Sequence, residues 1–257
     1  MKTIILCGGK GTRMREETEY RPKPLVEIGG KPILWHIMKI YAAHGFNEFI
    51  VALGYKGDMI KDYFFNYRMR AHDFTLDMAN DKVTYYDNGG DNFVITFAET
   101  GAESLTGERI KRLRRYLKDE KEFMVTYGDG VADIAIPELL AFHRKQETIG
   151  TITGVQPYSK YGFVNMDEDK NLVMNFHEKP LMQDSYINSG FMVFTHKIFD
   201  YLGHGMLETE TLAHLAGKNQ LSIYKHKGFW KAMDTTKEAE ELNRLWLADQ
   251  PWKVWRV

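Results

Sequence analysis

The chain has almost no cysteine and no imbalance of charge, and each of these absences excludes a class of protein. Its 257 residues include one cysteine, so neither an intrachain disulfide nor a cysteine-based zinc site can form. The 34 Lys and Arg residues nearly equal the 35 Asp and Glu residues, which leaves a formal net charge of -1 and no basic footprint for nucleic acid. We therefore expect a reducing compartment, no nucleic-acid partner, and only local clusters of anion-binding charge.

Long apolar runs are also missing. No stretch approaches the roughly 18 apolar residues that a membrane-spanning helix needs. Met1-Lys2 leads directly into an apolar run, without the layout of a signal peptide. Internal repeats, low-complexity segments and obvious linkers are absent as well. The sequence therefore predicts a cytoplasmic protein with no membrane partner, long enough to bury a substantial core.

A glycine-rich turn follows the first predicted strand, Lys2–Leu6, which is short, apolar and β-branched. Glycine lets backbone N–H groups approach a ligand closely, and successive amides in such a turn attract an anion. Arg13 adds a forked cation and Lys23 a compact one. The glycines of the turn are Gly8, Gly9 and Gly11. The pattern indicates a polyphosphate cradle; the alternative is a flexible loop with solvated cations.

Two common phosphate motifs do not fit this turn. A P-loop requires Ser or Thr after its lysine, but Lys10 is followed by Gly11. The dinucleotide fingerprint requires a third glycine at position 14, which is Met14.

Downstream, predicted strands and helices alternate in the way that is typical of a parallel sheet with crossover helices. Strands are expected at 49–53, 122–127, 149–155, 161–164, 173–177, 186–194 and 221–224, and helices at 33–41, 59–67, 110–118, 137–146, 196–202, 206–216 and 236–247. Residues 74–98 are strand-like and are interpreted as an inserted β excursion. Trp252 and Trp255 in the tail form either a subunit contact or packing on their own domain.

Two aspartates stand where chemistry is expected. Asp129 follows the strand 122–127, and ligands of open α/β sheets bind beyond the carboxyl ends of strands. Magnesium prefers carboxylate oxygens and shares its shell with substrate phosphates. The alternatives are that Asp129 only forms a turn, and that Asp234 only places a favourable charge at a helix start. Cys7, at the end of the first strand, is interpreted as a core residue.

Taken together, these residues resemble the sugar-1-phosphate nucleotidyltransferases over essentially the whole chain. The motifs, in the family's order, are the glycine loop with Arg13, Pro22-Lys23-Pro24, Tyr127-Gly128-Asp129-Gly130, Phe176-His177-Glu178-Lys179-Pro180, Ile187-Asn188-Ser189-Gly190-Phe191 and Met233-Asp234-Thr235. The resemblance implies an α/β fold: a Rossmann-like mixed, mostly parallel sheet flanked by helices, with a β-rich insertion and a sugar-binding portion. One domain, 1–257, would comprise a nucleotide-binding part (1–135), a sugar-phosphate-binding part (136–228) and a C-terminal part with a metal ligand (229–257).

The resemblance also implies a reaction and the residues for it. A sugar-1-phosphate oxygen attacks the α-phosphorus of a nucleoside triphosphate and releases pyrophosphate, with Mg²⁺ held by Asp129 and Asp234. The catalytic residues would be Arg13, Lys23 and Asp129. Nucleotide-binding residues would be Leu6, Gly8, Gly9, Gly11, Thr12, Arg13, Lys23, Thr106, Gly107, Arg109 and Gly128. Sugar-phosphate-binding residues would be Tyr127, Gly162, Glu178, Lys179, Asn188 and Gly190.

Four further stretches are similar to the branch of the family that joins CTP to glucose 1-phosphate: 13–18, 30–38, 106–112 and 228–230. The sequence identifies no residue that selects cytosine, so UTP, dTTP and other sugar 1-phosphates stay open. A glycosyltransferase and a non-catalytic sugar-nucleotide-binding regulator are the alternatives from other classes. Lys160 and Thr211 replace an Arg and a Pro that are frequent in the family. A homo-oligomer is also expected.

Overall fold

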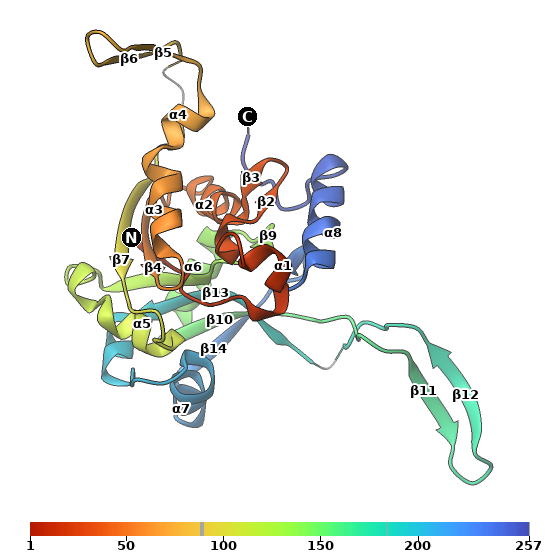
Figure 1. The fold of residues 1–257 in the computed structure, drawn as a ribbon. Helices are drawn as coiled ribbons and strands as arrows, with labels where there is room; N and C mark the ends of the chain where they lie inside the picture. Colours follow the sequence, from red (N-terminus) through yellow and green to blue (C-terminus); the bar gives the residue numbers. More distant parts are fainter. Residues whose placement is uncertain (88–89, 184, 257) are drawn as a thin grey trace.

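The computed structural model describes residues 1–257 except 88–89, 184 and 257. Its centre is a seven-stranded sheet in the order β14-β10-β13-β8-β1-β4-β7, with helices on both faces (Figure 1). These strands are β1 (Thr3–Leu6), β4 (Glu48–Leu53), β7 (Val94–Glu99), β8 (Glu122–Tyr127), β10 (Gly150–Val155), β13 (Ile187–Thr195) and β14 (Leu221–Lys225). β1 pairs in parallel with β4 and β8, whereas β13 runs antiparallel to β8 and β10. The predicted mixed, mostly parallel sheet is confirmed.

Short hairpins and ladders stand outside this sheet. They are formed by β2 (Glu27–Ile28) with β3 (Lys31–Pro32), β5 (Phe74–Asp77) with β6 (Lys82–Tyr85), β9 (Gly130–Ala132) with β15 (Trp230–Ala232), and β11 (Phe163–Asp167) with β12 (Leu172–His177). The β5–β6 and β11–β12 hairpins project from the body in different directions (Figure 1).

Helices cover both faces of the sheet. The α-helices are α1 (Arg15–Thr18), α2 (Ile33–Ala42), α3 (Gly57–Phe65), α4 (Tyr67–Ala71), α5 (Thr106–Arg112), α6 (Ile136–Gln146), α7 (Ala213–Gly217) and α8 (Thr236–Leu247). Short 3₁₀-helices are η1 (Thr12–Met14), η2 (Lys23–Leu25), η3 (Arg114–Tyr116) and η4 (His196–Asp200), and η5 (Leu207–Leu212) is a π-helix.

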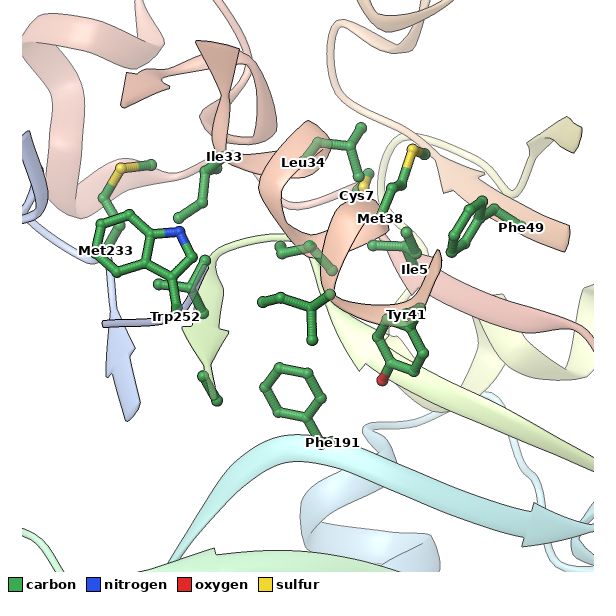
Figure 2. Close-up of a cluster of buried hydrophobic side chains, with 14 of the residues drawn as sticks. Ile5, Cys7, Ile33, Leu34, Met38, Tyr41, Phe49, Phe191, Met233 and Trp252 are labelled. Atoms are coloured by element: carbon green, nitrogen blue, oxygen red, sulfur yellow. The ribbon is translucent and has the colours of Figure 1, made fainter. Parts of the chain in front are cut away.

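The core divides between the two faces because strand side chains alternate. In β1, Ile5 packs in the cluster beneath α2, while Ile4 and Leu6 pack in the cluster beneath α5. Figure 2 shows the first cluster, in which Tyr41 stacks on Phe191 with ring centroids 5.8 Å apart. Cys7 belongs to this cluster, and burial raises the pKa of its thiol, as expected of a core residue.

The tail packs on its own domain. Trp252 is fully buried, and its indole donates to Nδ1 of His36 at 3.3 Å. Trp246 and Trp255 lie against the same imidazole. Of the two interpretations of the tail tryptophans, the structure therefore supports packing within the domain.

Several predicted boundaries were wrong. The helix expected at 59–67 breaks at Asn66, whose side-chain amide donates to the carbonyl and the carboxylate of Asp62. The helix expected at 110–118 begins at Thr106 and ends at Arg112. By contrast, the helix expected at 206–216 is confirmed as continuous helix over 207–217, with a π-helical first part, η5, followed by α7. The segment at 196–202 is the 3₁₀-helix η4.

The β excursion predicted at 74–98 was only partly correct. β5 and β6 form a separate hairpin, but β7 joins the main sheet in parallel with β4 and forms its edge. The strands predicted at 161–164 and 173–177 likewise leave the core and form the exposed β11–β12 hairpin.

Candidate active site

Lys23 lies between two carboxylates that come from distant parts of the chain. Its Nζ is 2.6 Å from Oδ2 of Asp129 and 2.6 Å from Oδ1 of Asp234. Asp129 follows β8 and Asp234 follows β15, and the β9–β15 ladder joins the two segments. Pro22 and Pro24 flank the lysine, and the short turn η2 directs it inward. The sequence motifs that predicted a common site are therefore brought together here.

Arg13 extends this cluster toward solvent. Its Nη1 is 2.8 Å from Oδ2 of Asp234, and the arginine side chain is 72% exposed. Burial raises the pKa of Asp234, but Lys23 and Arg13 outweigh it, so the pKa of this carboxyl lies below its usual value. Asp234 directly precedes the capping box that Thr235 and Glu238 form at the start of α8. Its carboxylate contacts the two cations, so its role exceeds that of a helix-terminal charge.

The glycine loop lies beside this cluster, at the carboxyl ends of β1 and β8. Leu6 pairs with Tyr127, so the segments that follow the two strands are neighbours. A Cβ on Gly128 would lie 2.9 Å from Sγ of Cys7 and 3.1 Å from the Leu6 carbonyl oxygen. Gly11 has φ +63° and opens the turn η1, which carries Thr12 and Arg13. The predicted phosphate-binding residues thus form one continuous edge.

Arg109 is in the interior rather than at the surface of this edge. It is 4% exposed, and its guanidinium donates to the carbonyls of Gly8, at 3.0 Å, and Leu53, at 3.0 Å, and to Oγ1 of Thr100, at 2.7 Å. The side chain therefore supports the glycine loop from behind. Contact between Arg109 and a nucleotide stays a prediction.

Part of the predicted sugar-phosphate set lies next to the metal-binding candidates. The ring of Tyr127 packs over Gly190, which has φ +93° and no room for a Cβ. Oδ1 of Asn188 accepts a hydrogen bond from the Gly190 N–H at 3.0 Å. Tyr127 ends β8, and Asn188 and Gly190 lie in β13.

The remaining members of that set are on the β11–β12 hairpin. Glu178 and Lys179 follow β12, are 61% and 62% exposed, and form an ion pair with each other at 3.5 Å. A Cβ on Gly162 would contact the ring of Phe176 on the same hairpin. The hairpin extends away from the body (Figure 1), and among the described residues the printed ion pair of Lys179 is with Glu178, whereas those of Lys23 are with Asp129 and Asp234.

The acidic groups fit a magnesium ion that is shared with substrate. Within the described part of the chain, no group of three or more His, Cys, Asp or Glu side chains could hold a metal ion. Two carboxylates, Asp129 and Asp234, converge on one point, and Mg²⁺ completes its octahedral shell with water and phosphate oxygens. The donor set therefore suits magnesium bound together with a nucleotide.

One residue that the sequence did not assign lies between the nucleotide-binding and sugar-phosphate-binding candidates. Glu208, in η5, accepts hydrogen bonds from the Tyr127 hydroxyl and from Oγ1 of Thr106. Its family-like stretch, 207–212, was visible in the sequence, but the convergence of Tyr127 and Thr106 on it requires the fold.

The sequence was compared with protein-family models and with the sequences of known proteins. Residues 2–240 match the model of the nucleotidyl transferase family. A probable glucose-1-phosphate cytidylyltransferase of Bacillus subtilis strain 168 is 46% identical over 99% of this chain and 100% of its own length. The glucose-1-phosphate cytidylyltransferase of Salmonella typhi is 42% identical over the same shares.

Solved structures show the same fold. A putative glucose-1-phosphate thymidylyltransferase of Bacillus anthracis has a TM-score of 0.69 at 18% identity, covering 95% of this chain and 94% of its own. At this identity, the likeness is one of fold alone. Among the described residues, no helix is long and apolar enough to span a bilayer.

Proposed function

Since the chain belongs to the nucleotidyl transferase family, we propose that it transfers the cytidylyl group of CTP to α-D-glucose 1-phosphate, giving CDP-glucose and pyrophosphate. The observation that carries this proposal is the sequence identity, over the whole length, with the probable glucose-1-phosphate cytidylyltransferase of Bacillus subtilis (46%) and the glucose-1-phosphate cytidylyltransferase of Salmonella typhi (42%). The pairing of Lys23 with Asp129 and Asp234 supports the chemistry independently.

The reaction requires alignment and charge neutralisation rather than proton transfer. A phosphate oxygen of glucose 1-phosphate, which is already anionic, forms a bond to the α-phosphorus of CTP. The bond from that phosphorus to the bridging oxygen breaks, and pyrophosphate leaves with the electron pair. Catalysis therefore depends on holding two anions in line and on stabilising the charge that builds up at the α-phosphate.

The proposed roles follow from the positions of the side chains. The glycine loop, Thr12 and Arg13 hold the triphosphate, and Lys23 moves from its carboxylate partners to the α-phosphate. Asp129 and Asp234 would hold Mg²⁺, and its charge would screen the phosphate charges. Tyr127, Asn188 and Gly190 line the side of the site where glucose 1-phosphate binds. Thr106 and Gly107 line the side where CTP binds.

We also propose a homo-oligomer, because the β11–β12 hairpin has the exposed apolar surface of an interface. Exposed contiguous apolar surface marks interaction sites. The exposed apolar residues of the hairpin and its base are Tyr158, Tyr161, Phe163, Val164, Met166, Leu172, Val173, Met174 and Phe176. In such an assembly, Glu178 and Lys179 of one copy would bind the sugar phosphate beside the Lys23 cluster of a neighbouring copy. The same hairpin then explains both the exposed surface and the distant sugar-phosphate candidates.

The proposed activity is tested by pyrophosphate release. The protein is supplied with Mg²⁺ and glucose 1-phosphate, and CTP, UTP, dTTP and ATP are offered separately. We expect release mainly with CTP, and loss of release in Asp129→Asn at unchanged thermal stability. Release mainly with another nucleotide would retain the mechanism and overturn the choice of base. Silence with all four nucleotides, and with mannose and galactose 1-phosphates, would favour a non-catalytic protein.

A further inference from the structure

Glu208 binds one element on each side of the proposed site. Its Oε1 accepts a hydrogen bond from the Tyr127 hydroxyl, at the end of β8. Its Oε2 accepts a hydrogen bond from Oγ1 of Thr106, at the start of α5, at 2.7 Å. The two oxygens of one carboxylate therefore join a sugar-phosphate-binding candidate to a nucleotide-binding candidate.

Backbone bonds strengthen the nucleotide side of this connection. The N–H groups of Gly107 and Glu108 donate to the Gly205 carbonyl at 3.1 and 3.3 Å. The Leu207 N–H donates to Oγ1 of Thr106 at 2.9 Å, so this hydroxyl both accepts from η5 and donates to it. A Cβ on Gly107 would lie 2.8 Å from the Gly205 oxygen, so only glycine permits this approach. The start of α5 is thus fixed to the segment that carries Glu208.

On the sugar-phosphate side, Glu208 holds the hydroxyl end of the Tyr127 ring. The ring covers Gly190, next to Asn188. The Tyr127 hydroxyl donates its hydrogen bond to Oε1 of Glu208. Hydrogen bonds to a carboxylate are about twice as strong as neutral ones. Glu208 therefore determines where the Tyr127 ring lies.

The element that carries Glu208 is itself unusual. η5 is a π-helix, and π-helical turns are rare and frequent at functional sites. Thr211, which replaces the family's proline, is 1% exposed within it. The wide turn places Leu207, Thr211 and Leu212 in the core beneath α5 while Glu208 reaches the site.

We infer that Glu208 is a positioning residue that sets the distance between the nucleotide and the sugar phosphate. This inference rests on the proposed nucleotidyl transfer, in which both substrates must be in line. A misplacement of about 1 Å can cost about 10²-fold in rate. Loss of the carboxylate frees Tyr127 and Thr106 together, so it impairs the use of both substrates.

The test compares steady-state kinetics of the wild type, Glu208→Ala and Glu208→Gln, with Glu210→Gln as the matched control in the same helix. We expect Glu208→Ala to lower kcat/KM about 10- to 100-fold for both CTP and glucose 1-phosphate. Glu208→Gln restores part of this, because its amide oxygen still accepts from one hydroxyl. Glu210→Gln, whose exposed side chain lies over Gly205, stays within about twofold by the usual neutrality of surface changes.

Tyr127→Phe and Thr106→Val each remove one of the two side-chain hydrogen bonds that Glu208 accepts. Tyr127→Phe should raise mainly the KM for glucose 1-phosphate, and Thr106→Val mainly the KM for CTP. Each should add little when combined with Glu208→Ala, because the connection is already lost. If Glu208→Ala does not fold, Glu208→Gln and these two variants decide the question.

Two results would overturn the inference. One is a variant with lowered thermal stability but unchanged kcat/KM for both substrates. The other is an effect of Glu208→Ala confined to a single substrate. A wild type that releases no pyrophosphate would instead refute the proposed function. Pyrophosphate release by the wild type is therefore measured before any variant is made.

Discussion

Lys23 forms ion pairs with two carboxylates in this structure and is proposed to contact an α-phosphate during the reaction. The cluster of Arg13, Lys23, Asp129 and Asp234 carries two positive and two negative charges, so it is balanced without substrate. A triphosphate would draw the cations away and leave the carboxylates available to a metal ion. The same four residues therefore pair with one another in the absence of substrate and are proposed to bind the triphosphate and the metal ion in its presence.

Removal of Lys23 tests this role. We expect Lys23→Met to lower kcat about 10²- to 10³-fold, the usual cost of one preorganised electrostatic group. Lys61→Met, which removes a partly exposed lysine that pairs with Asp58 at 3.1 Å and with Glu99, is the control. Pyrophosphate release measures both variants. Near-native turnover in Lys23→Met would exclude the lysine from the α-phosphate.

His36 predicts how stability depends on pH. The imidazole is fully buried, and its Nε2 donates to the Ile28 carbonyl at 2.8 Å while Nδ1 accepts from Trp252. Burial and the charge of Lys31 lower the pKa of His36 to about 4, although hydrogen bonds to backbone oppose them. In the unfolded chain the pKa of a histidine is about 6.5. Between pH 6.5 and about pH 4, the unfolded chain therefore binds more protons than the folded one, so the free energy of unfolding falls as the pH is lowered through this range.

The expected loss is about 3 kcal/mol between pH 7 and pH 4, from 1.36 kcal/mol per pKa unit. Urea unfolding at a series of pH values measures it. His36→Gln should be less stable at pH 7 but should show a flatter pH dependence. Equal slopes in the two proteins would mean that His36 does not titrate in this range.

Single residues differ in how far the sequence could assign them. Asp129 and Asp234 could be paired in advance because both stand in motifs that resemble the family's, and Asp129 also follows a strand of the main sheet. Arg109 was assigned to the nucleotide, yet its guanidinium bonds are made to carbonyls from three separate segments. Such long-range acceptors leave no pattern near residue 109.

At the scale of elements, strands were easier to predict than helices. β4 and β8 are apolar, β-branched runs that are buried almost throughout, so composition alone indicated them. η4 and η5 have helix-like spacing, but the type of helix depends on tertiary packing. The same limit applies to β7, since its exposed and buried residues do not distinguish an edge strand from a separate hairpin.

The β2–β3 hairpin offers a matched pair of glycines. Gly29 and Gly30 both have positive φ, +59° and +77°, as a two-residue hairpin turn requires. A Cβ on Gly29 would overlap the Trp246 indole, whereas a Cβ on Gly30 would have no described atom within 4 Å. We expect Gly30→Ala to cost about 1–2 kcal/mol from the backbone alone.

Gly29→Ala should cost clearly more, because the indole of Trp246 must also move. Thermal or urea unfolding of both variants measures the difference. Equal losses would show that α8 accommodates a methyl group without cost, and that Trp246 does not pack rigidly on the hairpin.

At the scale of the whole molecule, the β11–β12 hairpin decides whether one chain is sufficient. Met174 is 62% exposed on β12. We expect Met174→Glu to lower the molar mass measured by light scattering and to reduce turnover. Leu247→Glu, at an exposed position on α8, should leave both unchanged. A monomeric wild type with full activity would contradict the proposed assembly.

Mixing two inactive variants tests the sharing of sites. Lys179→Ala retains an intact Lys23 cluster, and Asp129→Asn retains an intact hairpin. If neighbouring copies complete each other's sites, refolding the two together should give more activity than the sum of the separate proteins. Activity equal to that sum would place Lys179 at the cluster of its own chain.

The burial of Trp252 beside His36 has a consequence for how the chain is made. The two residues are 216 positions apart, so the aromatic core under α2 cannot close until residue 252 has left the ribosome. At about 5–20 residues per second, synthesis up to that point takes about 13–50 s. From the moment each is made, the apolar faces of β1, α2 and β4 lack part of their cover, so nascent chains should engage chaperones until Trp252 emerges.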